Sequence, residues 1–247
     1  DVNITFDEAI VSYLESGGEG RYLAPLQARF GDWPLARLTQ SAIDQAALEL
    51  HPKAGPATRV RRVHAPLSAI LNHAARRGLC ERIVVARPRL PRGVVRYLKP
   101  EEAERLIAAA APHLAPLIVF LLGTGARLGE ALRLDWADVD LEAARVAFRR
   151  TKNGSARGVP LEPRVRDALA ALEHRIGAVF RTPPRLGKPL GAAYSERTNS
   201  PIKTAFRAAC RRAGIERLRV HDLRHTWATW HYQRNRDLAA LMALGGW

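Results

Sequence analysis

Residues 83–97 constrain the fold of this chain most strongly, because they hold two prolines, four arginines and no acidic residue. Proline keeps such a segment extended, and arginine favours contact with phosphates. Helical patterns precede the segment, whereas helical and alternating patterns are mixed after it. A length of 247 residues allows one or two domains. We therefore expect two packed units, residues 1–82 and 98–247, joined by a basic, DNA-contacting linker at residues 83–97.

The first unit is expected to be a small helical bundle. Four stretches of helical periodicity are separated by turns that contain glycine or proline. The last stretch is long and carries several arginines beside an apolar stripe, which predicts one basic face. A generic helical bundle is the alternative. The four stretches cover residues 5–15, 20–30, 40–50 and 57–77.

The second unit is expected to be mainly α-helical with a small antiparallel β-sheet. Alternating patterns in residues 144–149 and 158–161 flank Asn153-Gly154, a strong hairpin signal that would place Lys152 at the tip. Thr124 is a plausible N-cap for a helix that has Arg127 in its first turn. A helix is also expected to start at Pro100, where acidic residues fill the first turn. The other helical patterns cover residues 117–122, 127–134, 162–176, 201–213, 220–232 and 236–243.

The distribution of charge favours a polyanionic partner. The formal net charge is +15, and the isoelectric point is near 11. Residues 1–54 hold four basic side chains against eight acidic ones, whereas residues 55–97 hold ten arginines and one acidic residue. A merely solvated face would spread its charge more evenly. We therefore expect nucleic-acid contact from residue 55 onwards.

Nothing in the sequence predicts secretion or a membrane. Cys80 and Cys210 lack the spacing of metal ligands or of a disulfide framework, so we expect packing residues in a reducing cytoplasm. No apolar run approaches the ~20 residues of a membrane span, and no signal-peptide pattern opens the chain. Because the first residue is Asp1 and not Met, we expect a fragment of a longer protein.

Two short motifs carry the candidate chemistry. Arg127 lies in Thr-Gly-Ala-Arg-Leu-Gly-Glu, and almost a hundred residues later His221 and Arg224 lie in His-Asp-Leu-Arg-His. On a helix, His221, Arg224 and His225 share one face, opposite Leu223 and two tryptophans. Two arginines suit a phosphodiester, because a planar guanidinium grips two oxygens at once and stays charged. The motifs predict DNA-strand chemistry.

In order and spacing, these motifs resemble those of the tyrosine recombinases, the phage-integrase family. That family has an arginine in a T-G-x-R-x-x-E context, a lysine on a hairpin, a His-x-x-Arg pair and a later His or Trp. The resemblance implies a helical, SAM-like core-binding domain in residues 1–82 and an α+β catalytic domain in residues 98–247. The matching residues are Arg127, Lys152, His221, Arg224 and Trp247.

The resemblance also implies what these residues do. Arg127 and Arg224 would clamp the scissile phosphate, and Lys152 would protonate the leaving 5′ oxygen. His221 would assist proton movement at the nucleophile. The non-catalytic alternatives are an ordinary helix ion pair for Arg127 and a solvated turn lysine for Lys152.

Three further residues are assigned to the surroundings of the site. Trp247 would donate its indole N–H to a phosphate oxygen or buttress the site, although a core tryptophan is the alternative. Glu130 would be the partner of Arg127, three residues along the helix. His225 is expected to be a packed structural histidine next to the catalytic residues.

The nucleophile is not visible in this sequence. The family's tyrosine follows the His or Trp position by roughly nine residues, which would place it beyond Trp247. The energy of the broken ester is held in a phosphotyrosine, so we expect neither a metal nor another cofactor. The tyrosines that are present, none of them at the family's position, are Tyr13, Tyr22, Tyr97, Tyr194 and Tyr232.

The expected function is site-specific integration or excision of a mobile element, as by a prophage or genomic-island integrase. The expected partners are double-stranded DNA and further copies of the chain, as a tetramer on paired sites, in the bacterial cytoplasm at the nucleoid. The arginines that we expect to contact DNA are Arg59, Arg61, Arg62, Arg87, Arg89 and Arg92.

Parts of the sequence are also compatible with three other functions. A zinc peptidase is suggested by His221 and His225 at i, i+4, but Arg224 would place a cation beside the metal and no third ligand stands out. A DNA-binding relative or regulator without catalysis stays open, because the nucleophile is not visible. A type IB topoisomerase shares the chemistry, but the amino-terminal bundle and the Leu-Gly-Gly-Trp run favour a recombinase.

Overall fold

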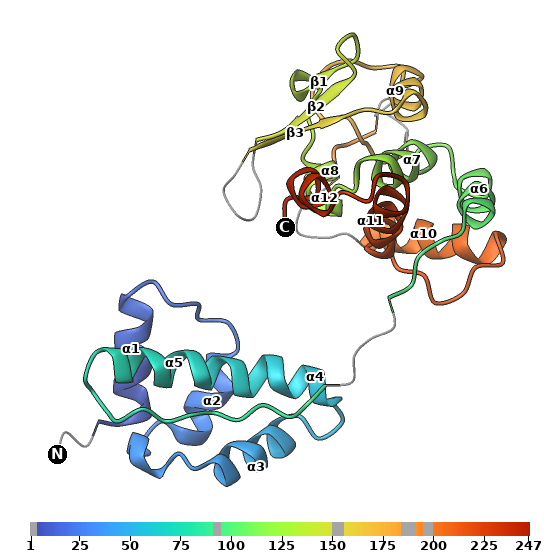
Figure 1. Ribbon diagram of the computed structural model, residues 1–247. Helices are drawn as coiled ribbons and strands as arrows, with labels where there is room; N and C mark the ends of the chain where they lie inside the picture. The colour runs from blue at the N-terminus through green and yellow to red at the C-terminus, as the bar shows by residue number, and fades with distance from the viewer. Residues whose placement is uncertain (1–3, 91–94, 150–155, 184–190, 195–199) are drawn as a thin grey trace. The chain divides into compact units, whose positions relative to one another are not determined.

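The protein consists of two compact units, Asp1–Gly93 and Val94–Trp247, and each has its own hydrophobic core. The division falls inside the predicted linker. A computed structural model describes residues 4–90, 95–149, 156–183, 191–194 and 200–247 (Figure 1).

The first unit is a helical bundle, as the sequence predicts. Each of the four predicted helical stretches is present, with ends displaced by no more than three residues. The last stretch contains a turn of π-helix that periodicity alone does not reveal. In Figure 1, α1 lies against α5. The elements are α1 (Phe6–Glu15), α2 (Leu23–Phe30), η1 (Leu35–Arg37), α3 (Gln40–Leu50), α4 (Pro56–Arg59), the π-helical η2 (Val60–His64) and α5 (Ala65–Arg76).

The start of the predicted linker packs on this first unit. Val85 is buried in the core of the bundle. The backbone of Ala86 is held by the side-chain amide of Gln40, through bonds of 2.8 and 3.1 Å. Residues 83–86 are therefore an extended edge of the bundle.

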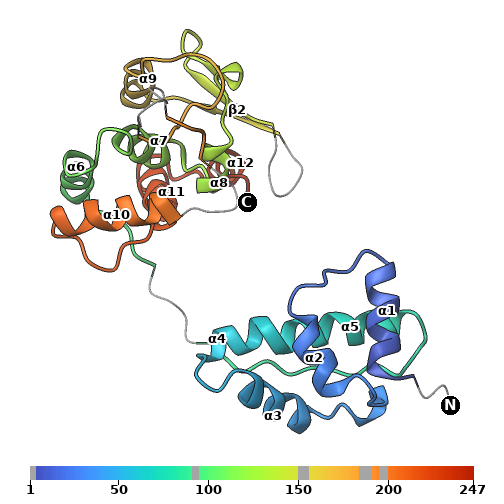
Figure 2. The ribbon, with the colours of Figure 1, turned by 180° about the vertical axis from the view of Figure 1, so that it is seen from behind.

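The second unit is mainly helical with one small sheet, as predicted. The sheet and α9 lie at one end of the unit, and α6 and α10 lie side by side at the other (Figures 1 and 2). The central helix α7 is buried along most of its length and packs against α9 and α11. The helices are α6 (Pro100–Ala108), α7 (Ala115–Thr124), α8 (Leu128–Leu132), η3 (Trp136–Asp138), α9 (Pro163–Ala170), α10 (Ser200–Arg212), α11 (Asp222–Asn235) and α12 (Leu238–Gly245).

The sheet is antiparallel in the order β1-β2-β3. The predicted hairpin strands are β2 and β3, which pair from Arg145 opposite Pro160 to Phe148 opposite Arg157. The first strand, only two residues long, was not predicted because no alternation develops over that length. The strands are β1 (Val139–Asp140), β2 (Arg145–Phe148) and β3 (Arg157–Pro160).

The predicted cap of the second motif is wrong. Thr124 is the last residue of α7 and precedes the N-cap of α8 by three residues; its hydroxyl donates to the carbonyl of Phe120 at 2.6 Å and accepts from the N–H of Ala126 at 3.3 Å. Gly125 ends α7 with φ +62°, and Arg127 takes the N-cap position of α8. The reversal through Gly125 places Arg127 just ahead of the first turn that was expected to contain it.

Within the described ranges, no helix has the length and apolar character needed to cross a lipid bilayer. The same part of the chain contains no group of three His, Cys, Asp or Glu side chains placed to hold a metal ion. Cys210 is buried and Cys80 partly so, and burial raises the pKa of both thiols.

Candidate active site in the second unit

Arg224 is held inside the second unit by two backbone carbonyls. It lies in the first turn of α11, whose apolar side is anchored by Leu223 and Trp227. The Arg224 side chain is buried as well, which differs from the expectation of an openly presented cationic face. Its two Nη groups donate to the carbonyls of Gly125 at 2.6 Å and Gly245 at 2.7 Å. These bonds fix the plane of the guanidinium.

Arg224 remains charged in this position. Burial, together with the positive charge of Arg127, lowers the pKa of the Arg224 guanidinium to about 10. At neutral pH it is therefore protonated. A guanidinium has five N–H donors, and two are bound to carbonyls here, so at most three remain for a bound anion.

Arg127 is fixed by Glu130 and by the carboxyl end of α12. Its Nη1 donates to Glu130 at 2.9 Å, and its Nη2 donates to the carbonyl of Gly246 at 2.8 Å. Its side chain is 28% exposed. Gly245 and Gly246 thus present adjacent carbonyls to the two arginines, which brings both guanidinium groups to the same turn.

Glu130 joins two arginines. Its side chain is only 2% exposed, and it accepts bonds from the backbone N–H and the Nη1 of Arg127 and from both Nη groups of Arg157. Burial alone would raise the pKa of the Glu130 carboxyl, but the bonds from Arg157 and Arg127 outweigh it and lower the pKa to about 2. Glu130 is paired with Arg127 and Arg157, and Arg224 adds a third positive charge nearby, so the site keeps an excess of positive charge suited to a phosphate.

Trp247 covers one face of Arg224. The guanidinium carbon lies 4.1 Å from the centroid of the Trp247 ring, and the ring stacks on Trp227 at 6.1 Å with an interplanar angle of 22°. Trp227 also explains Gly125, because a Cβ there would come within 2.1 Å of the Trp227 ring. Trp247 is 50% exposed, so it lines the site and is not a core residue.

His221 stands at the amino-terminal end of α11 with an exposed imidazole. Its ring meets the ring of His225 edge-on, with centroids 5.0 Å apart. Partial burial, the neighbouring His225 and the charge of Arg224 lower the pKa of His221, so it is neutral at neutral pH and can accept a proton. Asp222 is fully buried and accepts bonds from Arg219, which fixes the start of the helix.

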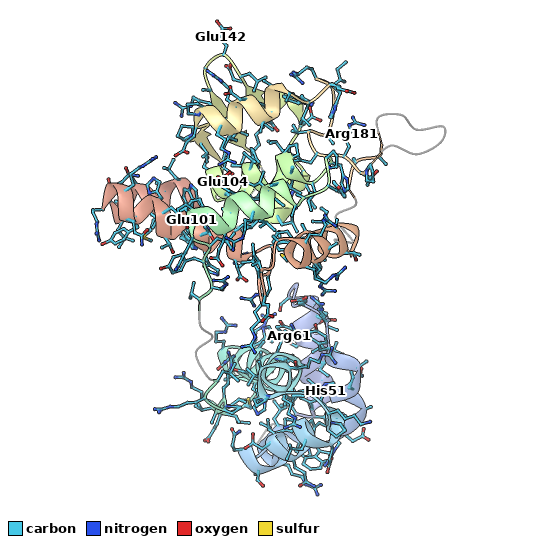
Figure 3. The ribbon with its side chains drawn as sticks, turned by 90° about the vertical axis from the view of Figure 1, so that its right-hand side faces the viewer. His51, Arg61, Glu101, Glu104, Glu142 and Arg181 are labelled. Carbon is cyan, nitrogen blue, oxygen red and sulfur yellow. The ribbon has the colours of Figure 1, made fainter. Side chains whose placement is uncertain are left out.

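The remaining predicted site residues belong to the first unit or fall outside the described residues. Lys152 and Arg92 fall in the two ranges 150–155 and 91–94, which the structure does not describe. In the first unit, Arg59 donates to the carbonyls of His51 and Pro52, so its guanidinium supports a loop. Arg61, Arg87 and Arg89 are exposed (Figure 3 labels Arg61), and Arg62 lies over the Tyr22 ring at 5.6 Å.

Arg157 is the residue of this cluster that the sequence did not single out. It opens β3, directly after the predicted hairpin tip, and its side chain is 9% exposed. On a strand beside a hairpin, an arginine is usually solvated. Its partner Glu130 is 27 residues away in the sequence, so no local spacing identifies the pair.

The second unit, with its arginine cluster, matches a known protein family. Residues 96–247, more than half of the chain, match the model of the phage integrase family, so this chain belongs to that family. It is 36% identical over 167 residues to the integrase of Salmonella phage P22, an alignment that covers 62% of this chain and 41% of that protein.

Solved structures share the fold of both units. A λ integrase dimer bound to a core site matches with a TM-score of 0.72 at 16% identity, covering 99% of this chain and 95% of that one. A λ integrase tetramer bound to a Holliday junction matches with a TM-score of 0.69 at 17% identity, covering 100% and 78%. The chain spans less than half the length of the first curated relatives that it matches.

Proposed function

We propose that this chain forms the core of a site-specific DNA recombinase that cuts and rejoins DNA strands through a 3′-phosphotyrosine intermediate. The observation that carries the proposal is the pair Arg127 and Arg224, whose guanidinium groups are fixed by carbonyls of one turn and still have N–H donors to offer. Integration or excision of a mobile element is the proposed role, in line with family membership.

The arginine pair suits the transition state of phosphoryl transfer. As a phenolic oxygen attacks phosphorus, charge builds on the non-bridging oxygens, and donors that are already oriented stabilise that charge without reorganising. The carbonyls of Gly125, Gly245 and Gly246 supply this orientation. Trp247, over the face of Arg224, limits its movement and excludes water on that side.

Two proton-transfer roles complete the proposal. Lys152, which lies between β2 and β3 in the sequence, would protonate the leaving 5′ oxygen. His221, neutral because of its surroundings, would accept a proton from the attacking hydroxyl.

The nucleophile is proposed to be a tyrosine that follows Trp247 in the gene product. Among the tyrosines at hand, Tyr194 is buried, which raises its pKa to about 12 and makes it a poor nucleophile. Tyr232 lies on α11 eight residues after Arg224, which is about 12 Å along the helix axis. Tyr13 and Tyr22 belong to the first unit, and Tyr97 precedes α6.

The proposed partners are duplex DNA and further copies of the chain. A tetramer on paired sites is proposed, because a solved λ integrase of the same fold is a tetramer on a Holliday junction. A bacterial cytoplasmic location at the nucleoid is proposed, since chromosomal DNA, the proposed substrate, lies there. The exposed Arg61, Arg87 and Arg89 are proposed to contact phosphates, which position the protein without reading the bases.

The proposal is tested by trapping the covalent intermediate. The gene product extended through the expected tyrosine should form a denaturant-resistant adduct with a nicked suicide substrate, because the nick prevents religation. The chain ending at Trp247 should bind the same DNA and form no adduct. An adduct on the 247-residue chain would make one of its own tyrosines the nucleophile. No adduct with the extended protein would favour a DNA-binding relative without catalysis.

DNA binding itself should depend steeply on salt. The ten arginines of residues 55–97 are opposed by a single acidic residue, and each phosphate that an arginine neutralises releases counterions. We expect the logarithm of the affinity to fall linearly with the logarithm of the salt concentration, with a slope of about −0.9 for each contact. Fluorescence anisotropy over a salt series measures it. A flat slope would remove nucleic acid as the partner of this surface.

A further inference from the structure

The Arg157 side chain ties three parts of the second unit together. Both of its Nη groups reach the Glu130 carboxylate, at 3.1 and 2.7 Å, and its Nε donates to the carbonyl of Leu244 at 2.9 Å. Its guanidinium also lies over the Phe148 ring, 4.6 Å from the centroid. One buried cation therefore connects the hairpin to α8 and to the last turn of α12.

The Arg157 partners are the same groups that orient Arg127. Glu130 holds both the backbone N–H and the Nη1 of Arg127, and the α12 turn that binds Arg157 at Leu244 binds Arg127 at Gly246. A shift of Arg157 would therefore release both Glu130 and the α12 turn. Arg127 would then lose the fixed positions of its two partners, the Glu130 carboxylate and the Gly246 carbonyl.

We propose that Arg157 is a positioning residue for the cleavage reaction, acting through Glu130 to hold the Arg127 guanidinium in its phosphate-binding orientation. This inference rests on the proposed recombinase function. Arg157 itself is not placed on the phosphate, because its three observed bonds go to protein oxygens and its face lies on Phe148.

The geometry requires arginine at this position. A guanidinium is planar and presents a fork that matches a carboxylate, with the Nε donor free to bind a third group at its side. Lysine would retain the charge, but it would approach Glu130 as a single point without fixing the plane of the carboxylate. Arg157→Lys therefore tests orientation separately from charge.

The test compares single-turnover cleavage, DNA affinity and melting temperature in the full-length gene product. Arg157→Lys should slow cleavage by on the order of 100-fold, since a displacement of about 1 Å in a catalytic group costs that much. Affinity should stay close to that of the wild type, and a melting curve should show a folded protein with a lowered melting temperature. The matched control is Arg145→Lys, an exposed arginine on the neighbouring strand, which should cut at the wild-type rate.

A double-mutant cycle separates positioning from a purely structural role. If Arg157 acts through Arg127, Arg157→Lys should slow an Arg127→Lys protein much less than it slows the wild type. Additive effects would overturn the proposal, and so would wild-type cleavage by Arg157→Lys.

A second variant keeps the inference testable if Arg157→Lys does not fold. Glu130→Gln retains the shape of the side chain while losing its charge, and it should slow cleavage by a similar factor. Wild-type cleavage by Glu130→Gln would also overturn the proposal. If the wild-type gene product forms no adduct, the recombinase function fails; if it does and these variants match it, only the role of Arg157 fails.

Discussion

Replacing Arg224 by alanine in the full-length gene product should reduce the rate of DNA cleavage by about 10³-fold or more. The buried guanidinium is fixed by the carbonyls of Gly125 and Gly245 before any substrate arrives, so its donors act on the transition state at no cost of reorganisation. DNA affinity should change little, because many other arginines are proposed to contact the DNA backbone. Single-turnover cleavage of a suicide substrate, together with anisotropy for binding, measures both.

Arg127→Ala should show the same separation of cleavage from binding. The matched control is Arg234→Ala, which removes a 76% exposed arginine from the same helix as Arg224 and should leave cleavage near the wild-type rate. Because Arg224 is buried, a melting curve is needed to show that the variant folds. Cleavage at the wild-type rate by both Arg224→Ala and Arg127→Ala would mean that the site lies elsewhere.

Lys152→Ala is expected to produce the second large loss, about 10²- to 10⁴-fold in cleavage rate. A general acid is needed because an alkoxide is a poor leaving group. A substrate with sulfur at the 5′-bridging position leaves as a thiolate without a proton, so it should restore cleavage by Lys152→Ala.

The sulfur substrate also discriminates between roles. It should not rescue Arg224→Ala, whose proposed role is to stabilise charge on the non-bridging oxygens, and this variant is the control. If sulfur fails to restore Lys152→Ala, the lysine is a phosphate ligand or a structural residue and not the acid.

The periodicity of apolar residues predicted most of the helices, because a helix that is buried on one face has apolar residues at regular spacing in the sequence. α3, whose ends match the prediction to the residue, shows this best. The π-helical turn at Val60–His64 and the two-residue β1 escaped, since neither changes the periodicity over a measurable length. The cap predicted at Thr124 is wrong because α7 continues through Thr124 and α8 begins only after Arg127.

The candidate site divides in the same way. Arg127, His221 and Arg224 could be predicted because they lie in short motifs, whereas the burial of Arg224 could not, because its partners are Gly125 and Gly245, distant in the sequence. Every residue has a backbone carbonyl, so the sequence does not show which carbonyls will bind a side chain. Arg157 was missed for a related reason. Its proposed positioning role depends on contacts with Glu130 and Leu244, which form only in the folded chain.

The turn at residues 244–246 also bears on the order in which the second unit is completed during synthesis. Its three carbonyls hold Arg157, Arg224 and Arg127, yet Leu244 follows Arg157 by 87 residues in the sequence. Domains fold from the amino terminus as the chain emerges. A nascent chain can therefore fold its first unit well before the three arginines of the second unit are aligned.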